Sequence, residues 1–308
     1  MEHLLIATVM AATPLLFGML GELITEKVGN LNLGVEGMML MGAVIGFRIA
    51  YTTENPYLAV IGALAAGAMG AAIYGFLTIS LKTNQVVTGL TLTIFGTGFA
   101  SFVGKSVSGV PLPYTVRSAF EPIAIPVLSK IPVIGHALFN QDILIYVAYI
   151  CTLVCAFYLS KTQVGLNARA VGENAGAADA SGINVNLYKY CNVIAGGALC
   201  GLGGAYMSLV TIPVWQENIT AGRGWIAVAL VIFASWKPGK AILGALLFGM
   251  LSILGYRFQA MGIEISQYLV DMIPYIATII IVIVSTRKNR KEDLPPGNLG
   301  DSYFREER

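Results

Sequence analysis

Two charged residues stand in otherwise apolar surroundings, and each comes directly before a glycine. Glu36 lies in a polar, glycine-rich stretch at 29–40, and Arg223 lies in a similar stretch at 218–227. A charge that enters lipid is costly unless it is paired or hydrogen-bonded, so such residues are typical of functional positions in membranes. We expect the two charges to pair with each other or across a dimer and so hold one state of a gate. The alternative is that they cap helices at the membrane surface.

Residues that could carry out catalysis are scarce. The chain has two histidines, and its only adjacent acidic pairs, at 292–293 and 306–307, lie in the tail. General acid–base or Mg²⁺ chemistry therefore has few candidates. Residues 104–106 match the end of a phosphate-binding loop, but Phe99 occupies the position of its first glycine. Four cysteines in apolar runs indicate neither a disulfide framework nor a metal site. An enzyme is thus a poor interpretation.

The composition is that of a membrane protein. Of 308 residues, 56% are hydrophobic and only 12% are charged. A soluble domain carries about 25% charged residues, so this chain could not cover a water-exposed surface of its size. The net charge of +2 gives no argument for nucleic acid. The 35 glycines lie mostly in apolar runs, where small residues let helices pack closely in lipid.

Apolar segments of near-spanning length predict an all-α, polytopic protein with about nine transmembrane helices. We expect one transmembrane domain over 1–286, followed by a cytoplasmic polar tail at 287–308. The candidate spans are 4–25, 34–51, 56–81, 84–104, 142–160, 188–211, 224–236, 240–257 and 266–286. Two of them, 34–51 and 224–236, are short.

Lysine and arginine in short loops mark the cytoplasmic side of a membrane protein. The marked positions are Lys27, Lys82, Lys161, Arg169, Lys189, Lys237, Lys240 and the run that starts at Arg287. With nine spans they place the N-terminus outside and the C-terminus inside. The loop at 105–141 then lies outside, and its five prolines predict an ordered, partly extended cap.

Small residues recur every four positions in the third span and predict a face for close helix packing. They are Ala59, Ala63, Gly67, Ala71 and Gly75.

The two glycine-rich stretches also predict an inverted repeat. If Glu36 matches Arg223, spans one to four match spans six to nine, and the fifth span inverts the second half. Interrupted helices at matching positions of two inverted repeats are typical of a transport path. Polar candidates for that path, besides the two charges, are Asn30, Asn32, Asn84, Gln85 and Thr88. The alternative for each is that it caps a helix or bonds to nearby backbone.

The loop at 161–186 is too polar to enter a membrane. Asn174 can cap the start of a helix, the alanine-rich run after it favours helix, and Gly182 can end it. We therefore expect a helix of about two turns on the cytoplasmic face, where it could lie in a groove of another protein.

This loop resembles the ATPase-coupling loop of permeases from ABC importers of the branched-chain amino acid, simple-sugar and nucleoside group. The matching residues are Gly165, Leu166, Arg169, Ala170, Val171, Gly172, Glu173, Asn174, Ala177, Ala178, Gly182, Ile183 and Asn184. Four further blocks resemble the same family: 31–39, 84–90, 221–227 and 272–275. The nucleoside-type branch matches best. One departure is Thr93, where relatives in this branch often carry Asn, and it bears on the preference for purine or ribose.

The resemblance implies a translocation subunit with no ATPase site and no cofactor of its own, because ATP and Mg²⁺ are bound by the partner ATPase. It implies three kinds of partner in a bacterial cytoplasmic (inner) membrane: an ABC ATP-binding subunit, a second permease chain (paralogous or identical) and an external substrate-binding lipoprotein. The residues expected to couple to the ATPase are Gly165, Arg169, Gly172, Glu173, Asn174, Ala178 and Gly182. A nucleoside is the first substrate expected, with a simple sugar or a riboflavin-like compound as alternatives.

An ion-coupled secondary transporter is the rival class, because inverted repeats and broken helices also occur there. It would need an acidic residue for ion coupling, and Glu36 and Asp271 are the only candidates expected near the spans. The loop at 161–186 has no evident use in such a protein, since no ATPase would bind it.

Overall fold

The computed structural model describes residues 2–126, 128–131, 134–260 and 294–306, together with single positions between 269 and 283. The long helices are α1 (Glu2–Glu26), α2 (Val35–Thr53), α3 (Pro56–Gly75), α4 (Gln85–Gly104), α7 (Ile143–Lys161), α10 (Val185–Tyr206) and α12 (Pro238–Ala260). The shorter helices are α5 (Tyr114–Ser118), α6 (Ile134–Phe139), α8 (Gln163–Glu173), α9 (Ala175–Ala180) and α11 (Arg223–Phe233). One π-helical turn extends α3 (Phe76–Ser80) and another extends α10 (Met207–Thr211), and 3-10 turns occupy Lys105–Val107 and Leu128–Lys130. The strands β1 (Ile123–Ala124) and β2 (Asn140–Gln141) form an antiparallel pair.

The described helices agree with the first eight predicted spans to within three residues at each end. Six of them, counting the turns that extend α3, α4 and α10, are long and apolar enough to cross a membrane. Helix α11 is short, as predicted, whereas α2 reaches spanning length. Most of the ninth predicted span lies outside the described residues, and so do Asp271 and the basic run at 287–291.

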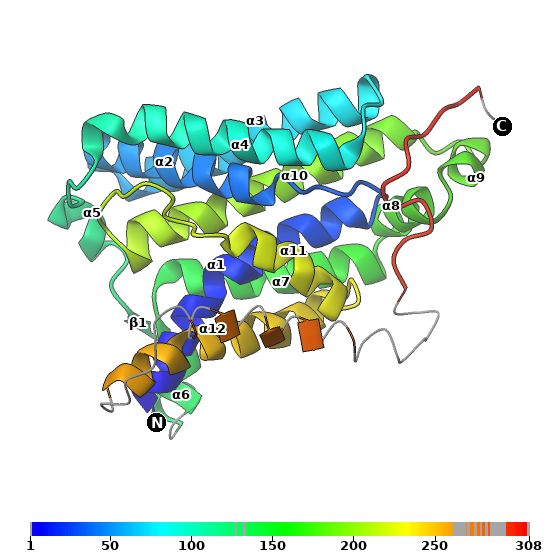
Figure 1. The fold of residues 1–308 in the computed structure, drawn as a ribbon. Coiled ribbons are helices and arrows are strands. Elements are labelled where there is room, and N and C mark those ends of the chain that lie inside the picture. The colour runs from blue at the N-terminus through cyan, green and yellow to red at the C-terminus, as the bar shows by residue number, and fades with distance from the viewer. Residues whose placement is uncertain are drawn as a thin grey trace.

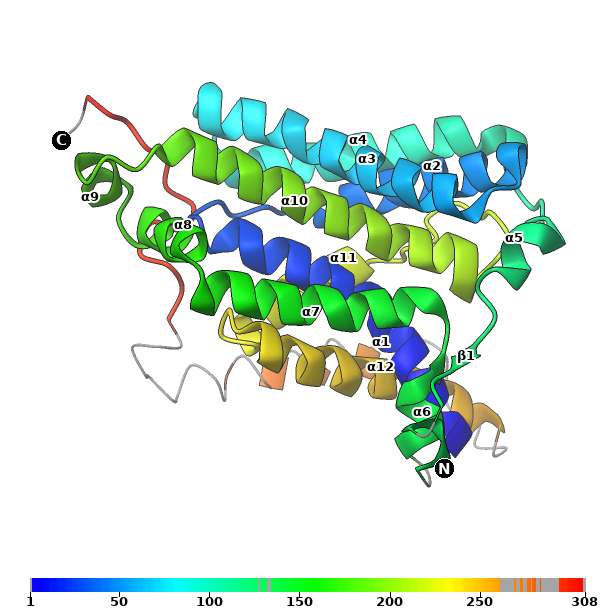
Figure 2. The ribbon, with the colours of Figure 1, turned by 180° about the vertical axis from the view of Figure 1, so that it is seen from behind.

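The long helices run side by side between two ends of the molecule (Figures 1 and 2). One end carries α5, α6 and the strand pair, and the N-terminus lies there, with Glu2 3.6 Å from His136. The other end carries α8, α9 and the last described residues. The loops at 105–141 and 161–186 therefore lie at opposite ends, as predicted. The first of them is an ordered cap that also contains short helices, which its prolines did not predict.

Two non-helical segments enter the molecule from opposite ends, and α2 and α11 begin where these segments stop, midway along the molecule (Figure 1). Segment 27–34 turns inward beside α8 after α1 ends. Segment 212–222 turns inward at the other end, where Val214 pairs with Pro111. Gly29 and Gly222 both have positive φ, +84° and +81°, a backbone conformation that glycine adopts without strain. The predicted inverted repeat requires two such segments that enter from opposite ends, and most of its last span lies outside the described residues.

Glycine lets α3 and α2 approach the backbone of α10. A Cβ added at Gly67 or at Gly42 would lie less than 3.0 Å from the backbone of Gly201, closer than real Cβ atoms approach. The predicted small-residue face of α3 is buried along its length. A larger side chain at these positions would force α2 or α3 away from α10. The contact of these helices with α10 therefore depends on close backbone packing rather than on large apolar side chains.

We predict that Gly67→Ala destabilises the protein by about 1–3 kcal/mol, because its methyl group has no room against α10. Thermal unfolding in detergent measures the change. Gly98→Ala is the matched control, since nothing lies within 4 Å of its added Cβ on α4. It should leave stability unchanged or raise it by about 0.5–1 kcal/mol. Equal effects of the two substitutions would contradict the packing described here.

Candidate functional site

The Glu36 carboxylate joins the two interrupted segments. It is 4% exposed at the start of α2, and it accepts three hydrogen bonds from the residues that begin α11. The donors are the Thr220 hydroxyl at 2.5 Å, the Gly222 amide at 2.9 Å and the Gly224 amide at 2.6 Å. A helix N-terminus presents free amides and the positive end of its dipole, so it stabilises a buried carboxylate. Glu36 therefore caps a helix in the other half of the chain.

Glycine is required where α2 meets α11 and where α2 meets α4. A Cβ at Gly224 would lie 2.5 Å from Cα of Glu36, and a Cβ at Gly37 would lie 2.5 Å from the carbonyl oxygen of Leu92 in α4. The two glycines that directly follow a charged residue in the sequence, Gly37 and Gly224, thus lie where the backbones of neighbouring helices are in contact.

The expected pairing of Glu36 with Arg223 inside the chain is wrong. The carboxylate takes the amides and the Thr220 hydroxyl as donors instead of the guanidinium. Arg223 is half-buried and donates to the Thr220 carbonyl at 3.3 Å. Helix-end amides compete with a guanidinium for a carboxylate because they have no intrahelical acceptor.

Most of the amide and hydroxyl side chains predicted for the path bond to nearby backbone. Asn84 caps α4 through the Val87 amide, and Thr88 donates to the Asn84 carbonyl. The Asn32 side chain accepts from the Gly34 amide at 2.9 Å. These contacts are the alternative that the sequence left open for each residue.

Asn30, Gln85 and Thr93 lie at segment 27–34 itself. Gln85 is 3% exposed and accepts from the Leu31 amide at 2.7 Å, whereas Thr93 donates to the Leu33 carbonyl at 3.0 Å. Asn30 is fully buried, and within the described residues neither of its side-chain polar atoms has a hydrogen-bond partner. Among the five predicted polar path residues it alone combines full burial with unused hydrogen-bonding groups.

Two buried carboxyl groups that were not among the predicted site residues, Glu22 and Glu26, lie one turn apart near the end of α1. Glu22 accepts from the Asn32 amide at 2.9 Å, and Glu26 accepts from the Trp236 indole nitrogen. The expectation that Glu36 and Asp271 are the only acidic residues near the spans is therefore wrong. Their spacing of four, which places both on one helix face, was the available signal. The pair ties segment 27–34 and the turn after α11 to α1.

The loop at 161–186 contains two helices. Asn174 caps α9 through the Ala177 amide at 2.9 Å, and Gly182 follows it with φ +81°, both as predicted. Helix α8 was not predicted. A Cβ at Gly165 would collide with the end of α7, and a Cβ at Gly172 would collide with the Lys27 carbonyl, so both glycines fix α8 against the bundle.

Helix α9 has one buried and one exposed face. Ala175 and Ala178 pack into an apolar cluster with Val28 and Val171, and Ala177 and its neighbours on the other face stay accessible. A short helix with small exposed side chains can lie in a groove of a partner.

The charged residues of α8 face segment 27–34. Burial lowers the pKa of Lys27, and the nearby Glu173 carboxylate opposes this shift. Arg169 also lies near Lys27, and its buried Nε has no hydrogen-bond partner in the described part of the chain. Two of the predicted coupling residues, Arg169 and Glu173, therefore interact electrostatically with Lys27 at the start of the interrupted segment.

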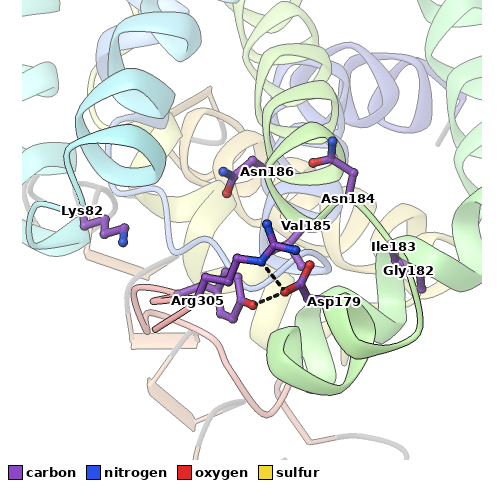
Figure 3. Close-up of a pocket in the computed structure, with 9 residues that line it drawn as sticks. Lys82, Asp179, Gly182, Ile183, Asn184, Val185, Asn186 and Arg305 are labelled. Atoms are coloured by element: carbon purple, nitrogen blue, oxygen red, sulfur yellow. Dashed lines mark hydrogen bonds and ion pairs between the residues drawn. The ribbon is translucent and has the colours of Figure 1, made fainter. Parts of the chain in front are cut away.

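The last described residues, 294–306, lie across this end of the molecule, and we call them the C-terminal strap. The Asp179 carboxylate of α9 accepts from the Tyr303 hydroxyl at 2.8 Å and lies 3.2 Å from Nε of Arg305 (Figure 3). Together with Lys82 and the turn into α10, these residues line a recess of about 450 Å³. The sequence predicted only a polar tail here.

The chain is similar to known transport proteins over almost its whole length. Residues 4–282 match the family model described as branched-chain amino acid transport system, permease component. A proposed glucose ABC transporter permease of Haloferax volcanii is 39% identical over 98% of each chain. The guanosine ABC transporter permease NupQ of Bacillus subtilis is 34% identical over 89% of each chain, and the nucleoside permease NupC of Lactococcus lactis is 32% identical over 88%. In each organism a second ABC permease also matches, at 24–26% identity. No solved structure matches.

We predict that Glu36→Gln destabilises the protein by about 1.5–3 kcal/mol, the usual range for hydrogen bonds to a charged group. An amide can accept at its oxygen but cannot satisfy all three donors, and its NH₂ group would face one of them. Thermal unfolding of the purified chain measures the loss. Glu217→Gln is the control, because this carboxylate is exposed in the same stretch of sequence. If both variants unfold alike, Glu36 does not cap α11.

Proposed function

The chain belongs to the permease family of branched-chain amino acid transport systems, and we propose that it moves a nucleoside inward across the cytoplasmic membrane. Permeases of ABC transporters are multi-pass membrane proteins without an ATPase site, and a separate ABC subunit hydrolyses ATP. They work with a second permease chain. Family membership removes the ion-coupled alternative. An external substrate-binding lipoprotein that delivers the solute completes the proposed machine.

The observation that carries the proposed mechanism is the Glu36 link between two helices that begin midway along the molecule. Segments 27–34 and 212–222 approach this link from opposite ends, so each could open to one side. Non-helical backbone at such depth is tolerated where it is buried in protein or lines a cavity. In the proposed cycle, movement of segment 27–34 brings Asn30 to the path, where its free amide can bond to the solute.

The exposed face of α9 is the proposed contact with the ATPase. It follows α8 after the single residue Asn174, and Gly172 of α8 touches the backbone of segment 27–34. A displacement of α9 would therefore reach the interrupted segment through α8. In the proposed mechanism, Arg169 and Glu173 interact electrostatically with Lys27 where α8 meets segment 27–34.

A nucleoside is supported by the two relatives named for nucleoside and guanosine transport. A simple sugar is the second candidate, supported by the more similar relative named for glucose. Both solutes present several hydroxyl groups on a ring.

We predict ATP-dependent accumulation of radiolabelled guanosine in proteoliposomes that contain this chain, its second permease, the ATPase and the binding protein. Excess unlabelled adenosine should compete, and excess glucose should not. A hydrolysis-deficient ATPase subunit is the control. Accumulation of glucose alone would move the protein to the sugar branch. Uptake driven by an ion gradient without ATP would refute the proposal.

We predict that α9 faces the cytoplasm and that the 105–141 cap faces outward, because the basic loops alternate in this way. In cells expressing the chain with Cys151 and Cys191 replaced by serine, a membrane-impermeant maleimide should label Ser118→Cys and fail to label Ser181→Cys. Ser181 is exposed, so it should react once the membrane is permeabilised. The reverse pattern would invert the topology.

A further inference from the structure

The C-terminal strap is bonded by its backbone to two parts of the molecule far apart in sequence. The Asn298 amide donates to the Gly172 carbonyl at the end of α8 at 2.9 Å, and the Gly300 amide donates to the Gly29 carbonyl at 3.1 Å. Two residues of strap thus hold the end of α8 and the start of segment 27–34 together. Gly297 adds a bond from its amide to the Glu173 carboxylate at 3.2 Å.

One buried side chain connects the strap to the interior of the same segment. Nε2 of Gln85 donates to the Asp301 carbonyl at 3.3 Å, and its Oε1 accepts from the Leu31 amide at 2.7 Å. Gln85 therefore bridges two backbones that do not bond to each other at these positions. It was expected to line the solute path, and its contacts point to a different task.

The far end of the strap holds α9. Tyr303 and Arg305 both contact Asp179, whose side chain is only 14% exposed. Phe304 stands between these two residues in the strap, and the centre of its ring lies 4.2 Å from Nζ of Lys82. The strap is thus anchored on both sides of the recess in Figure 3.

We propose that the C-terminal strap transmits the movement of α9 to segment 27–34, with Asp179, Tyr303 and Gln85 as positioning residues. The path of contacts runs from Asp179 to Tyr303, along the strap to Asp301, and through Gln85 to Leu31. Helix α9 has six residues and is otherwise attached through its two chain connections and its apolar cluster. This inference rests on the proposed coupling role of α9, but its first test does not.

The first test uses hydrogen exchange of the purified full chain, measured by mass spectrometry. The double variant Tyr303→Phe/Arg305→Gln removes both polar contacts of the strap with Asp179 and keeps the aromatic ring that packs on the apolar cluster under α9. Exchange in peptides covering 27–34 should accelerate roughly five- to tenfold, the effect of losing about one hydrogen bond. Glu306→Gln, at an exposed strap residue, is the matched control and should change nothing.

Coupling between two sites is reciprocal, so the reverse substitution gives the sharper result. Gln85→Glu keeps the acceptor for the Leu31 amide and removes the donor to Asp301. It should accelerate exchange in α9, which Gln85 does not touch. If each variant affects only its own surroundings, the strap is a local anchor and the inference is overturned.

The assembled transporter supplies the second test. If α9 couples to the ATPase, Tyr303→Phe/Arg305→Gln should lower solute uptake while ATP hydrolysis continues, so more ATP is used per solute moved. Ala177→Trp, on the exposed face of α9, tests the coupling role by itself, because Glu173 is also bonded to the strap. Normal uptake in Ala177→Trp together with reciprocal exchange effects would refute the coupling proposal and keep the strap connection. If the strap variant used no more ATP per solute moved than the unmodified chain, the proposal that the strap transmits movement from α9 to segment 27–34 would be refuted.

Discussion

A chain that crosses lipid must satisfy its buried backbone amides within the protein, and here the chain is interrupted twice at depth. The amides at the start of α11 have no intrahelical acceptors, and the carboxylate of Glu36 supplies one for Gly222 and Gly224. The acceptor belongs to the first half of the chain and the donors to the second. One side chain therefore fixes the relative position of two halves that approach from opposite ends. Gly224 is required by the same contact, because any side chain there would displace Glu36.

The features that sequence analysis predicted correctly depend on local chemistry. The length of the hydrophobic runs predicted the first eight helices. The spacing of small residues predicted the packed face of α3. Asn174 and Gly182 predicted where α9 begins and ends. That Glu36 caps a helix was the alternative left open by the sequence, but which helix it caps could not be derived in this way. Its donors lie 184 to 188 residues away, and its charge suggested Arg223 as the partner. Whether the carboxylate bonds to amides or to a guanidinium depends on how closely the backbones of α2 and α11 approach. No pattern within a single sequence specifies that distance.

The same limit explains the missed carboxyl groups and the missed strap. Glu22 and Glu26 stand near the end of an apolar run, where a carboxylate would ordinarily reach water. They are buried because segment 27–34 folds back and Trp236 covers them. The tail is polar, and its sequence is typical of a chain that is exposed to solvent. Its order comes largely from backbone bonds to Gly172 and Gly29, which leave no signature in the side chains.

The glycine contacts among α2, α3 and α10 have a mechanical consequence. Backbones in direct contact cannot slide or tilt without opening voids or colliding, so these three helices behave as one stiff block. Helices α11 and α8 also make close glycine contacts, but fewer of them: Gly224 against Glu36, and Gly165 and Gly172 against Tyr158 and Lys27. Their other contacts described above are hydrogen bonds and polar contacts. A rearrangement during a working cycle would therefore separate fewer backbone contacts at α11 and at the α8–α9 unit than inside the block.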